Sequence, residues 1–489
     1  MPSAPNPVRP EVLPGIPRST FALLAAFAAF AFTIIVPTAL RDGDTGWHLA
    51  TGAWIVAHIR VPTSDPFSFT ATGRPWVAHE WLSELAMYAS YRAAGWSGLI
   101  VLIGTAMATL CALIAYEIRR WLSTRASIVA LLMLATGLLP SLLARPHIIA
   151  LPMLAGWLIM LLHARERGEA PPSGFAVLML VWANAHGSFV FGLALAAVFA
   201  FEALVVAAPL DRRRAVQRWG AFGVACAVAV TATPAGFDGL AFPLYVDSLK
   251  LLAHLNEWQP ADFATFSGFE AILLATLALL LLRPVRIPPV RLVLMLGVLH
   301  LALQHTRQAI VLVVVGVLIL AEPLGKAWCE TTACPPKLRP ARESAPVSLL
   351  VLLLAFGLAG YRIAVPVVRT DSAGIPATAL RRLPPHLQGQ RVFNEYSFGG
   401  SLILAGIRPY IDGRSDMYGD PFTLDYFRIA AGNAQRWRAA NAYWHFGWTI
   451  LPPRSPLIAL LDHDPAWRRI YADDTAVIHQ AVPARRPNL

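Results

Sequence analysis

Long apolar blocks that carry almost no charge dominate this sequence. Residues 20–40 and 347–361 are each most or all of the roughly 20 apolar residues that a membrane-spanning helix needs. Of the 489 residues, 56% are hydrophobic and 14% are charged, whereas about 25% of the residues in a soluble domain are charged. The pattern excludes a soluble enzyme and predicts a polytopic membrane protein.

We expect a mainly α fold, a polytopic transmembrane helical bundle of about eleven segments. They lie near residues 20–40, 96–116, 126–143, 147–162, 174–185, 188–208, 220–234, 268–282, 292–304, 308–322 and 347–367. Several are too short for a full crossing, which predicts broken helices buried against neighbours. We divide 174–208 at Asn184-Ala-His-Gly187, because the basic stretches on both sides then share one face.

The distribution of Lys and Arg predicts the orientation. With the N-terminus inside, the loops on its side hold 18 of the 40 basic residues, and the short loops on the other side hold seven. The net charge of +11 therefore reflects membrane topology, and we expect no nucleic-acid partner. We predict a multi-pass membrane protein, in contact with the lipid bilayer, with a cytoplasmic N-terminus.

The predicted organisation has three parts: a cytoplasmic tail at 1–19, a transmembrane domain at 20–368, and a soluble α/β domain at 369–489 that faces the periplasm. From about Thr370 the apolar runs shorten, and Pro, Gly and charged residues become common. Within this domain the sequence predicts strands at Arg391-Val-Phe393, Pro409-Tyr-Ile411, Trp448-Thr-Ile-Leu451 and Thr475-Ala-Val-Ile478, and helices at 421–431, 433–443 and 455–461.

The first outer loop, 41–95, is the longest loop between helices. Residues 46–59 and 78–92 read as amphipathic helices lying along the membrane surface, and we expect four tryptophans to anchor them: Trp47, Trp54, Trp76 and Trp81. Long loops with their own structure are usually functional. We therefore expect this loop to form a platform over the bundle.

Candidate chemistry begins with Asp42 and Asp44 in this loop. One carboxylate could deprotonate an acceptor hydroxyl, or both could hold a divalent cation beside a phosphate. The alternative is a purely structural role, in which the same two residues form a helix cap and an exposed turn. Glu80 is a second acidic candidate, and it shares a helix face with Glu84. Position 83 is Ser where a second His would stand in the zinc-hydrolase motif, so that class is disfavoured.

Further polar residues fall at the predicted outer ends of helices. We assign substrate binding to a set drawn from these ends, the first loop and the C-terminal domain: His48, His79, Arg145, His147, His186, His305, Arg307, Asp412 and Arg414. Arg145 and Arg307 suit a phosphate, because a guanidinium binds it by paired hydrogen bonds. Singly, each residue also fits a loop or helix-end role, and Asp412 with Arg414 fits a salt-bridged turn.

Several segments resemble the GT-C superfamily, polytopic glycosyltransferases that use polyprenyl-phosphate-linked sugars and include the protein-mannosyltransferase and aminoarabinose-transferase types. The similarity is to a bacterial glycosyltransferase-like branch. It rests on Asp42-x-Asp44-x-Gly-Trp-His-Leu49, Ser64-Asp-Pro-Phe-Ser68, His79-Glu-Trp-Leu82, Trp182-Ala-Asn-Ala-His-Gly187, Asn256-Glu-Trp258, Phe398-Gly-Gly400 and Asp412-Gly-Arg414.

The resemblance implies a catalytic carboxylate at Asp42 or Asp44, with Glu80 as a second candidate, and a divalent cation such as Mg²⁺ or Mn²⁺ in some members. It implies transfer of a sugar from a polyprenyl-phosphate-linked donor to a hydroxyl on a glycan, lipid or protein acceptor at the outer face. Two alternatives remain at this point: a non-catalytic GT-C-like partner in envelope assembly, and a secondary transporter. Polar groups gathered at one face, with no internal repeat, count against transport.

Overall fold

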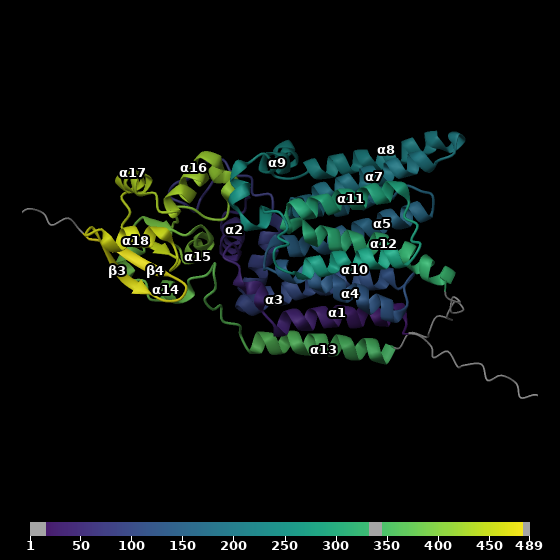
Figure 1. The fold of residues 1–489 in the computed structure, drawn as a ribbon, viewed down its shortest axis with the longest axis horizontal. Coiled ribbons are helices and arrows are strands. Elements are labelled where there is room, and N and C mark those ends of the chain that lie inside the picture. The colour runs from purple at the N-terminus through teal and green to yellow at the C-terminus, as the bar shows by residue number, and fades with distance from the viewer. Residues whose placement is uncertain (1–15, 332–344, 483–489) are drawn as a thin grey trace, which may run out of the picture.

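The computed structural model describes residues 16–331 and 345–482, which form a helical bundle and a smaller α/β domain beside one end of it (Figure 1). Most of the predicted tail 1–19 lies outside the described residues, as does part of the segment 323–346, which joins the last two bundle helices and is rich in Lys and Arg.

Each of the eleven predicted apolar segments corresponds to a helix of the bundle. The helices are α1 (Arg18–Ile35), α3 (Trp81–Ile118), α4 (Thr124–Leu138), α5 (Pro146–Glu166), α6 (Ala176–Ala185), α7 (Phe189–Val206), α8 (Pro209–Thr231), α10 (Gly268–Leu282), α11 (Pro289–Gln304), α12 (Ala309–Thr331) and α13 (Ala345–Ala364). In the described chain, seven helical segments are long and apolar enough to cross a membrane, and three shorter apolar helices accompany them. The chain is a multi-pass membrane protein.

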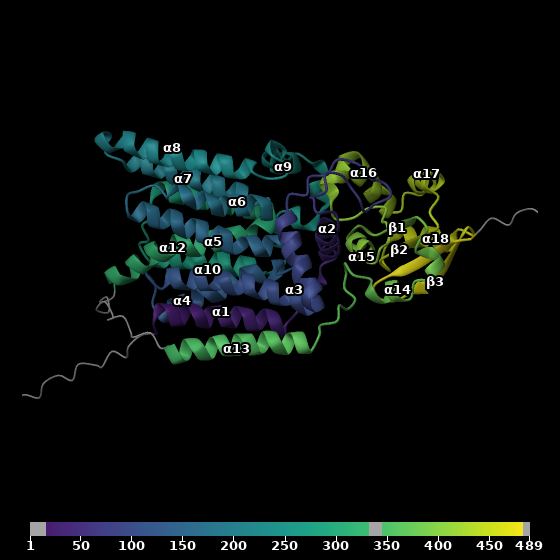
Figure 2. The same cartoon turned by 180° about the vertical axis from the view of Figure 1, so that it is seen from behind.

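The predicted break between α6 and α7 is confirmed. α6 ends at Ala185, His186 is extended, and α7 begins at Phe189. The ring of His186 lies 6.4 Å from the ring of His147, which stands in the first turn of α5. The ends of three helices therefore meet at the end of the bundle that faces the small domain (Figure 2).

The first outer loop contains the two predicted surface helices. α2 (Thr45–His58) lies across the domain-facing ends of the bundle helices (Figure 2). After a loop, the chain returns as the first part of α3, which bends at Ala94 and Gly95 before entering the bundle. Gly95 has φ 59°, a left-handed conformation that glycine adopts at little cost. The bend lets one continuous helix supply both a surface segment and a membrane span.

A second connection on the domain-facing side of the bundle joins α8 to α10 and reaches the small domain. It contains α9 (Phe237–Asp247) and the short 3-10 turns η4 (Lys250–His254) and η5 (Asn256–Trp258). The carboxylate of Asp420 accepts hydrogen bonds from the backbone N–H groups of Lys250 and Leu251, at 3.1 and 2.8 Å. These bonds connect η4 to the domain.

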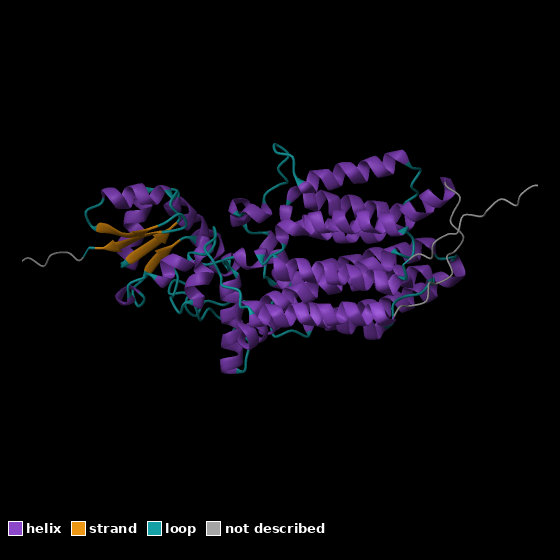
Figure 3. Cartoon of the chain, turned by 90° about the horizontal axis from the view of Figure 1, so that it is seen from below, coloured by secondary structure: helices purple, strands orange, loops and turns teal. Residues whose placement is uncertain are grey.

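The C-terminal domain is built around a four-stranded sheet at the end of the molecule away from the bundle (Figure 3). Its order is β1-β2-β4-β3, with β1 (Val392–Asn394) parallel to β2 (Trp448–Leu451), and β4 (Val477–Ala481) antiparallel to both β2 and β3 (Trp467–Ala472). Its helices are α14 (Ala377–Arg381), α15 (Gly399–Leu404), α16 (Ser415–Ala430), α17 (Ala434–Trp444) and α18 (Pro456–His463).

One predicted strand is wrong and one strand was not predicted. Pro409-Tyr-Ile411 is not a strand, because the side chain of Asn394 bonds its backbone, accepting from Tyr410 N–H and donating to Ile411 C=O, both at 2.8 Å. The strand β3 was not predicted. It lies at the edge of the sheet, where it pairs with one strand only, and its sequence, Trp-Arg-Arg-Ile-Tyr-Ala, contains two adjacent charged residues.

Candidate active site

The loop that carries Asp42 and Asp44, called the acidic loop below, packs closely against the C-terminal domain where glycines allow backbone contact. A Cβ atom on Gly43 would overlap the carbonyl oxygen of Ser397, and one on Gly46 would overlap that of Gly400. Only glycine lets the two backbones approach this closely. The acidic loop therefore lies where the bundle and the domain meet.

Arg145 joins the two predicted carboxylates. Its Nε and Nη2 donate to the two oxygens of Asp42, both at 2.6 Å, and Nη2 also lies 2.9 Å from Asp44 Oδ2. Arg145 directly precedes α5, so the start of that helix holds its backbone. The guanidinium supplies positive charge to both carboxylates.

Glu257 extends this group to Arg307. Its carboxylate bridges the two arginines, with one oxygen 3.3 Å from Arg145 Nη1 and the other 3.2 Å from Arg307 Nη1. The Glu257 side chain is 42% exposed. It was not among the predicted site residues, although the Asn256-Glu-Trp258 segment that holds it was noted.

Arg369 is a second residue that the sequence did not identify. It is buried, and it donates to the backbone carbonyl oxygens of Leu40, at 3.2 Å, and Asp42. Its guanidinium lies over the ring of Trp96. Arg369 belongs to no motif in the sequence, because it stands alone between the last bundle helix and the domain.

The two aspartates have different electrostatic environments. Burial alone raises the pKa of Asp42, but Arg145, helped by Arg369, brings it below its ordinary value. Burial raises the pKa of Asp44, and the result is a value of about 7. The negative charges of Asp42, Glu257 and Asp412 raise it further, whereas Arg145 lowers it only in part. The pKa of Asp44 thus lies near neutral pH, whereas that of Asp42 does not.

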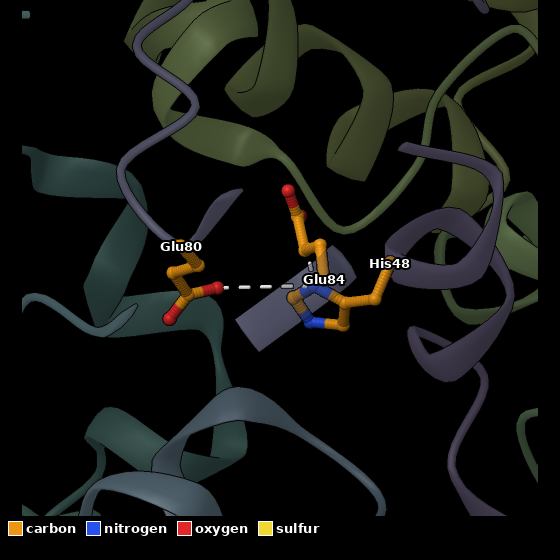
Figure 4. A group of neighbouring side chains, drawn as sticks. All are labelled: His48, Glu80 and Glu84. Carbon is orange, nitrogen blue, oxygen red and sulfur yellow. Dashed lines mark hydrogen bonds and ion pairs between the residues drawn. The ribbon is translucent and has the colours of Figure 1, made fainter. Parts of the chain in front are cut away.

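Glu80 lies among three predicted histidines. His186 Nε2 is 3.2 Å from Glu80 Oε1, His79 Nε2 is 3.7 Å from the same oxygen, and His48 Nδ1 is 3.8 Å from Oε2. His48 Nδ1 also lies 3.1 Å from Glu84 Oε1 (Figure 4). The sequence pointed to these residues separately, and the structure brings them together from three elements.

Burial determines the charges in this group. It lowers the pKa of His48, His79 and His186, which favours the neutral form of each ring. It also raises the pKa of Glu80 to about 7, an effect that Arg307 and Arg145 oppose. The influence of both arginines shows that the Glu80 group and the Asp44 group belong to one electrostatic site.

His147 and His305 hold backbone at the rim of this site. His147 Nε2 donates to the carbonyl oxygen of Ser141 at 2.8 Å, and His305 Nδ1 donates to that of Trp258 at 2.9 Å. The second bond fixes the turn that carries Glu257.

Asp412 and Arg414 form a buried ion pair at the joint between the loop and the domain. Arg414 Nη2 is 2.7 Å from Asp412 Oδ2, and Nη1 is 2.8 Å from Asp65 Oδ1 in the first outer loop. All three side chains are at most 1% exposed. Gly413 between them packs against the carboxylate of Asp44, which a Cβ atom would overlap. These charged groups position the acidic loop.

Comparison with known proteins identifies the fold. No family model matches the chain, and no curated protein matches its sequence. The apo oligosaccharyltransferase of Archaeoglobus fulgidus is 12% identical, over 88% of this chain and 69% of its own, with a TM-score of 0.50. ArnT from Cupriavidus metallidurans, solved with bound undecaprenyl phosphate, is 12% identical over 95% and 98%, with a TM-score of 0.51. These similarities confirm the fold expected from the resemblance to the GT-C superfamily.

Proposed function

We propose that the chain is a membrane glycosyltransferase that moves a sugar from a polyprenyl-phosphate-linked donor to a hydroxyl-bearing acceptor. The reaction takes place at the outer face of the bacterial inner membrane, where the C-terminal domain covers the site. The observation that carries this proposal is Asp44, a carboxylate with a pKa of about 7 that is paired with Arg145, which Glu257 joins to Arg307.

Asp44 is the general base in this scheme. Both oxygens of Asp42 accept hydrogen bonds from Arg145, whereas the ion pair of Asp44 with Arg145 uses one oxygen. The Asp44 side chain is also more exposed, 16% against 6%. A base with a pKa near the working pH is both available and able to take a proton from an acceptor hydroxyl. Asp42 positions Arg145.

Arg145 and Arg307 neutralise the departing phosphate. Fixed positive charge in a site of low dielectric stabilises developing negative charge most strongly. The Glu257 carboxylate already binds both guanidinium groups, which shows that an oxyanion fits between them. The donor phosphate takes this place when it displaces Glu257, whose exposed side chain is free to turn toward solvent.

The multi-pass bundle and the fold shared with ArnT support a lipid-linked donor. ArnT was solved with undecaprenyl phosphate, and seven helical segments of the described chain suit a bilayer. The polyprenyl tail remains among the membrane helices while its phosphate reaches the arginines at their outer end.

Native mass spectrometry of the full-length protein with undecaprenyl phosphate tests the proposal. We expect a bound lipid that Arg307→Ala weakens at least tenfold. Arg60→Ala is the matched control, since Arg60 is an exposed arginine of the same outer loop region that stacks on Trp54. Equal lipid binding by wild type, Arg307→Ala and Arg60→Ala, in folded protein, would contradict the proposed phosphate site and favour a non-catalytic partner.

A further inference from the structure

His48, Glu80 and Glu84 form a histidine–glutamate cluster with the ligand atoms of a metal site. One nitrogen and two carboxylate oxygens, one from each residue, all lie within 4.8 Å of one another. The side chains are 3%, 12% and 1% exposed. Within the described part of the chain, neither glutamate forms an ion pair with Lys or Arg, and their charged-group contacts are all histidines.

Glu84 supplies an independent sign that a positive partner belongs here. Its Oε1 contacts His48, but its Oε2 is buried and has no hydrogen-bond partner. A buried carboxylate oxygen without a donor or cation is costly, and native structures rarely tolerate one. A cation that both oxygens of the Glu84 carboxylate contact would supply the missing partner.

The spacing of the cluster fits a small ion. A tetrahedral zinc ion with bonds near 2.1 Å separates its ligand atoms by about 3.4 Å. The His48 nitrogen lies 3.1 Å from the Glu84 oxygen and 3.8 Å from the Glu80 oxygen, on either side of that value. Only small side-chain shifts would equalise the two distances.

The geometry points to a divalent transition-metal site: we propose that His48, Glu80 and Glu84 bind Zn²⁺ or a similar ion. A mixed set of imidazole and carboxylate ligands favours zinc over magnesium. His186 and His79 contact the other oxygen of Glu80, as outer partners that orient a metal-binding carboxylate commonly do. The proposed ligands are different residues from Asp42 and Asp44, which pair with Arg145.

A second His/Glu group at the opposite end of the bundle helices lacks these properties. Glu117, His163 and Glu166 also have ligand atoms within 4.8 Å. There, Arg120 lies 2.7 Å from Glu117 and 2.5 Å from Glu166, so an arginine already supplies the positive charge. This second group is the internal control for the first.

The bound ion would fasten α2 to α3. His48 lies on α2 and Glu84 on α3, and Gly52 lets the helices touch, because a Cβ there would overlap the Glu84 carbonyl oxygen. α2 begins directly after Asp44, so the ion would also hold the base in place. The proposal does not depend on the transferase function, since metal content and catalysis are measured separately.

Metal analysis of the purified full-length protein tests the site. The protein is equilibrated with Zn²⁺, freed of excess metal and measured by inductively coupled plasma mass spectrometry, with thermal unfolding recorded with and without Zn²⁺. We expect about one ion per chain and a higher unfolding temperature in Zn²⁺. Glu84→Gln and His48→Gln should each weaken zinc binding at least tenfold and abolish the thermal shift.

Glu117→Gln is the matched control and should retain both the ion and the shift. Since Glu84→Gln is a buried change, Glu80→Gln, at a more exposed position, tests the same site if Glu84→Gln does not fold. A folded wild-type protein with no stoichiometric zinc, manganese or cobalt would overturn the proposal in favour of a proton shared by the carboxylates. Equal zinc binding by wild type and the cluster variants would overturn it as well.

Discussion

Asp42 and Asp44 are two residues apart, yet their surroundings assign them different tasks. Both oxygens of Asp42 accept hydrogen bonds from Arg145, whereas the ion pair of Asp44 with Arg145 uses one oxygen and the pKa of Asp44 is raised to about 7. In the proposed reaction, one carboxylate holds a cationic side chain and the other exchanges protons.

Asp44→Asn should reduce transferase turnover by about 10²- to 10⁴-fold, the usual contribution of a general base, without loss of folding. Asp42→Asn should instead destabilise the protein, because it removes one partner of a partly buried ion pair. Turnover with a polyprenyl-phosphate sugar and thermal unfolding of both variants separate the two roles. Unchanged turnover in folded Asp44→Asn would exclude this residue as the base.

The pH profile should follow the ionisation of Asp44. Its pKa is raised to about 7, and the base must be unprotonated, so turnover should rise with pH up to about 7 and then level off. The groups that set this midpoint are Arg145, Asp42, Glu257 and Asp412. A profile that is flat from pH 5 to 8 would contradict the assignment.

Glu257→Gln should act in two ways. Removal of the carboxylate that bridges the arginines should strengthen the binding of undecaprenyl phosphate, since the lipid phosphate no longer competes with it. Because Glu257 raises the pKa of Asp44, the midpoint of the pH profile should also move to lower pH. Weaker lipid binding in this variant would show that Glu257 supports the site.

The sequence predicted most of the polar site but not its pairing. Asp42 stood out because it shares an acidic segment with a second carboxylate, and Arg145 and Arg307 stood out because a guanidinium at a predicted outer helix end suits a phosphate. Arg369 and Glu257 did not stand out, because the backbone and side-chain groups that they contact lie far away in the sequence. The buried state of Arg414 was equally invisible, as its partner Asp65 is 349 residues away.

At the scale of elements, the hydrophobic pattern was sufficient to predict the helices of the bundle, but it was a weaker guide to the strands of the domain. Apolar runs predict helices reliably in a membrane, where backbone groups must bond within the helix. Short strands compete with side-chain hydrogen bonds, which is why Asn394 displaced the strand predicted at Pro409-Tyr-Ile411.

The contact between α2 and α15 depends on two glycines. Gly46→Ala should lower stability and turnover together, because a methyl group there overlaps the backbone of Gly400. Gly220→Ala is the control, since a Cβ atom on that residue of α8 meets nothing within 4 Å. Thermal unfolding and turnover measure both variants, and a Gly46→Ala protein equal to the control would show that the helices separate freely.

At the scale of the molecule, the buried ion pairs of Arg414 hold the first outer loop on the C-terminal domain. Arg414→Met should cost about 3–5 kcal/mol, because it leaves buried Asp412 and Asp65 without their positive partner. Limited proteolysis should then cut the loop at 59–80 faster than in wild type. An unchanged cleavage rate would show that the glycine contacts alone hold the loop.

The joint at Arg414 also has a consequence for biosynthesis. Asp42, Asp44 and Asp65 leave the ribosome among the first residues of the chain, whereas Arg369 and Arg414, which bind that loop, are made near the end. Until then the acidic loop lacks both partners, and the nascent protein carries an incomplete reaction centre. The proposed activity would therefore begin only when the last quarter of the polypeptide has folded onto this loop, so a prematurely terminated product would be inert.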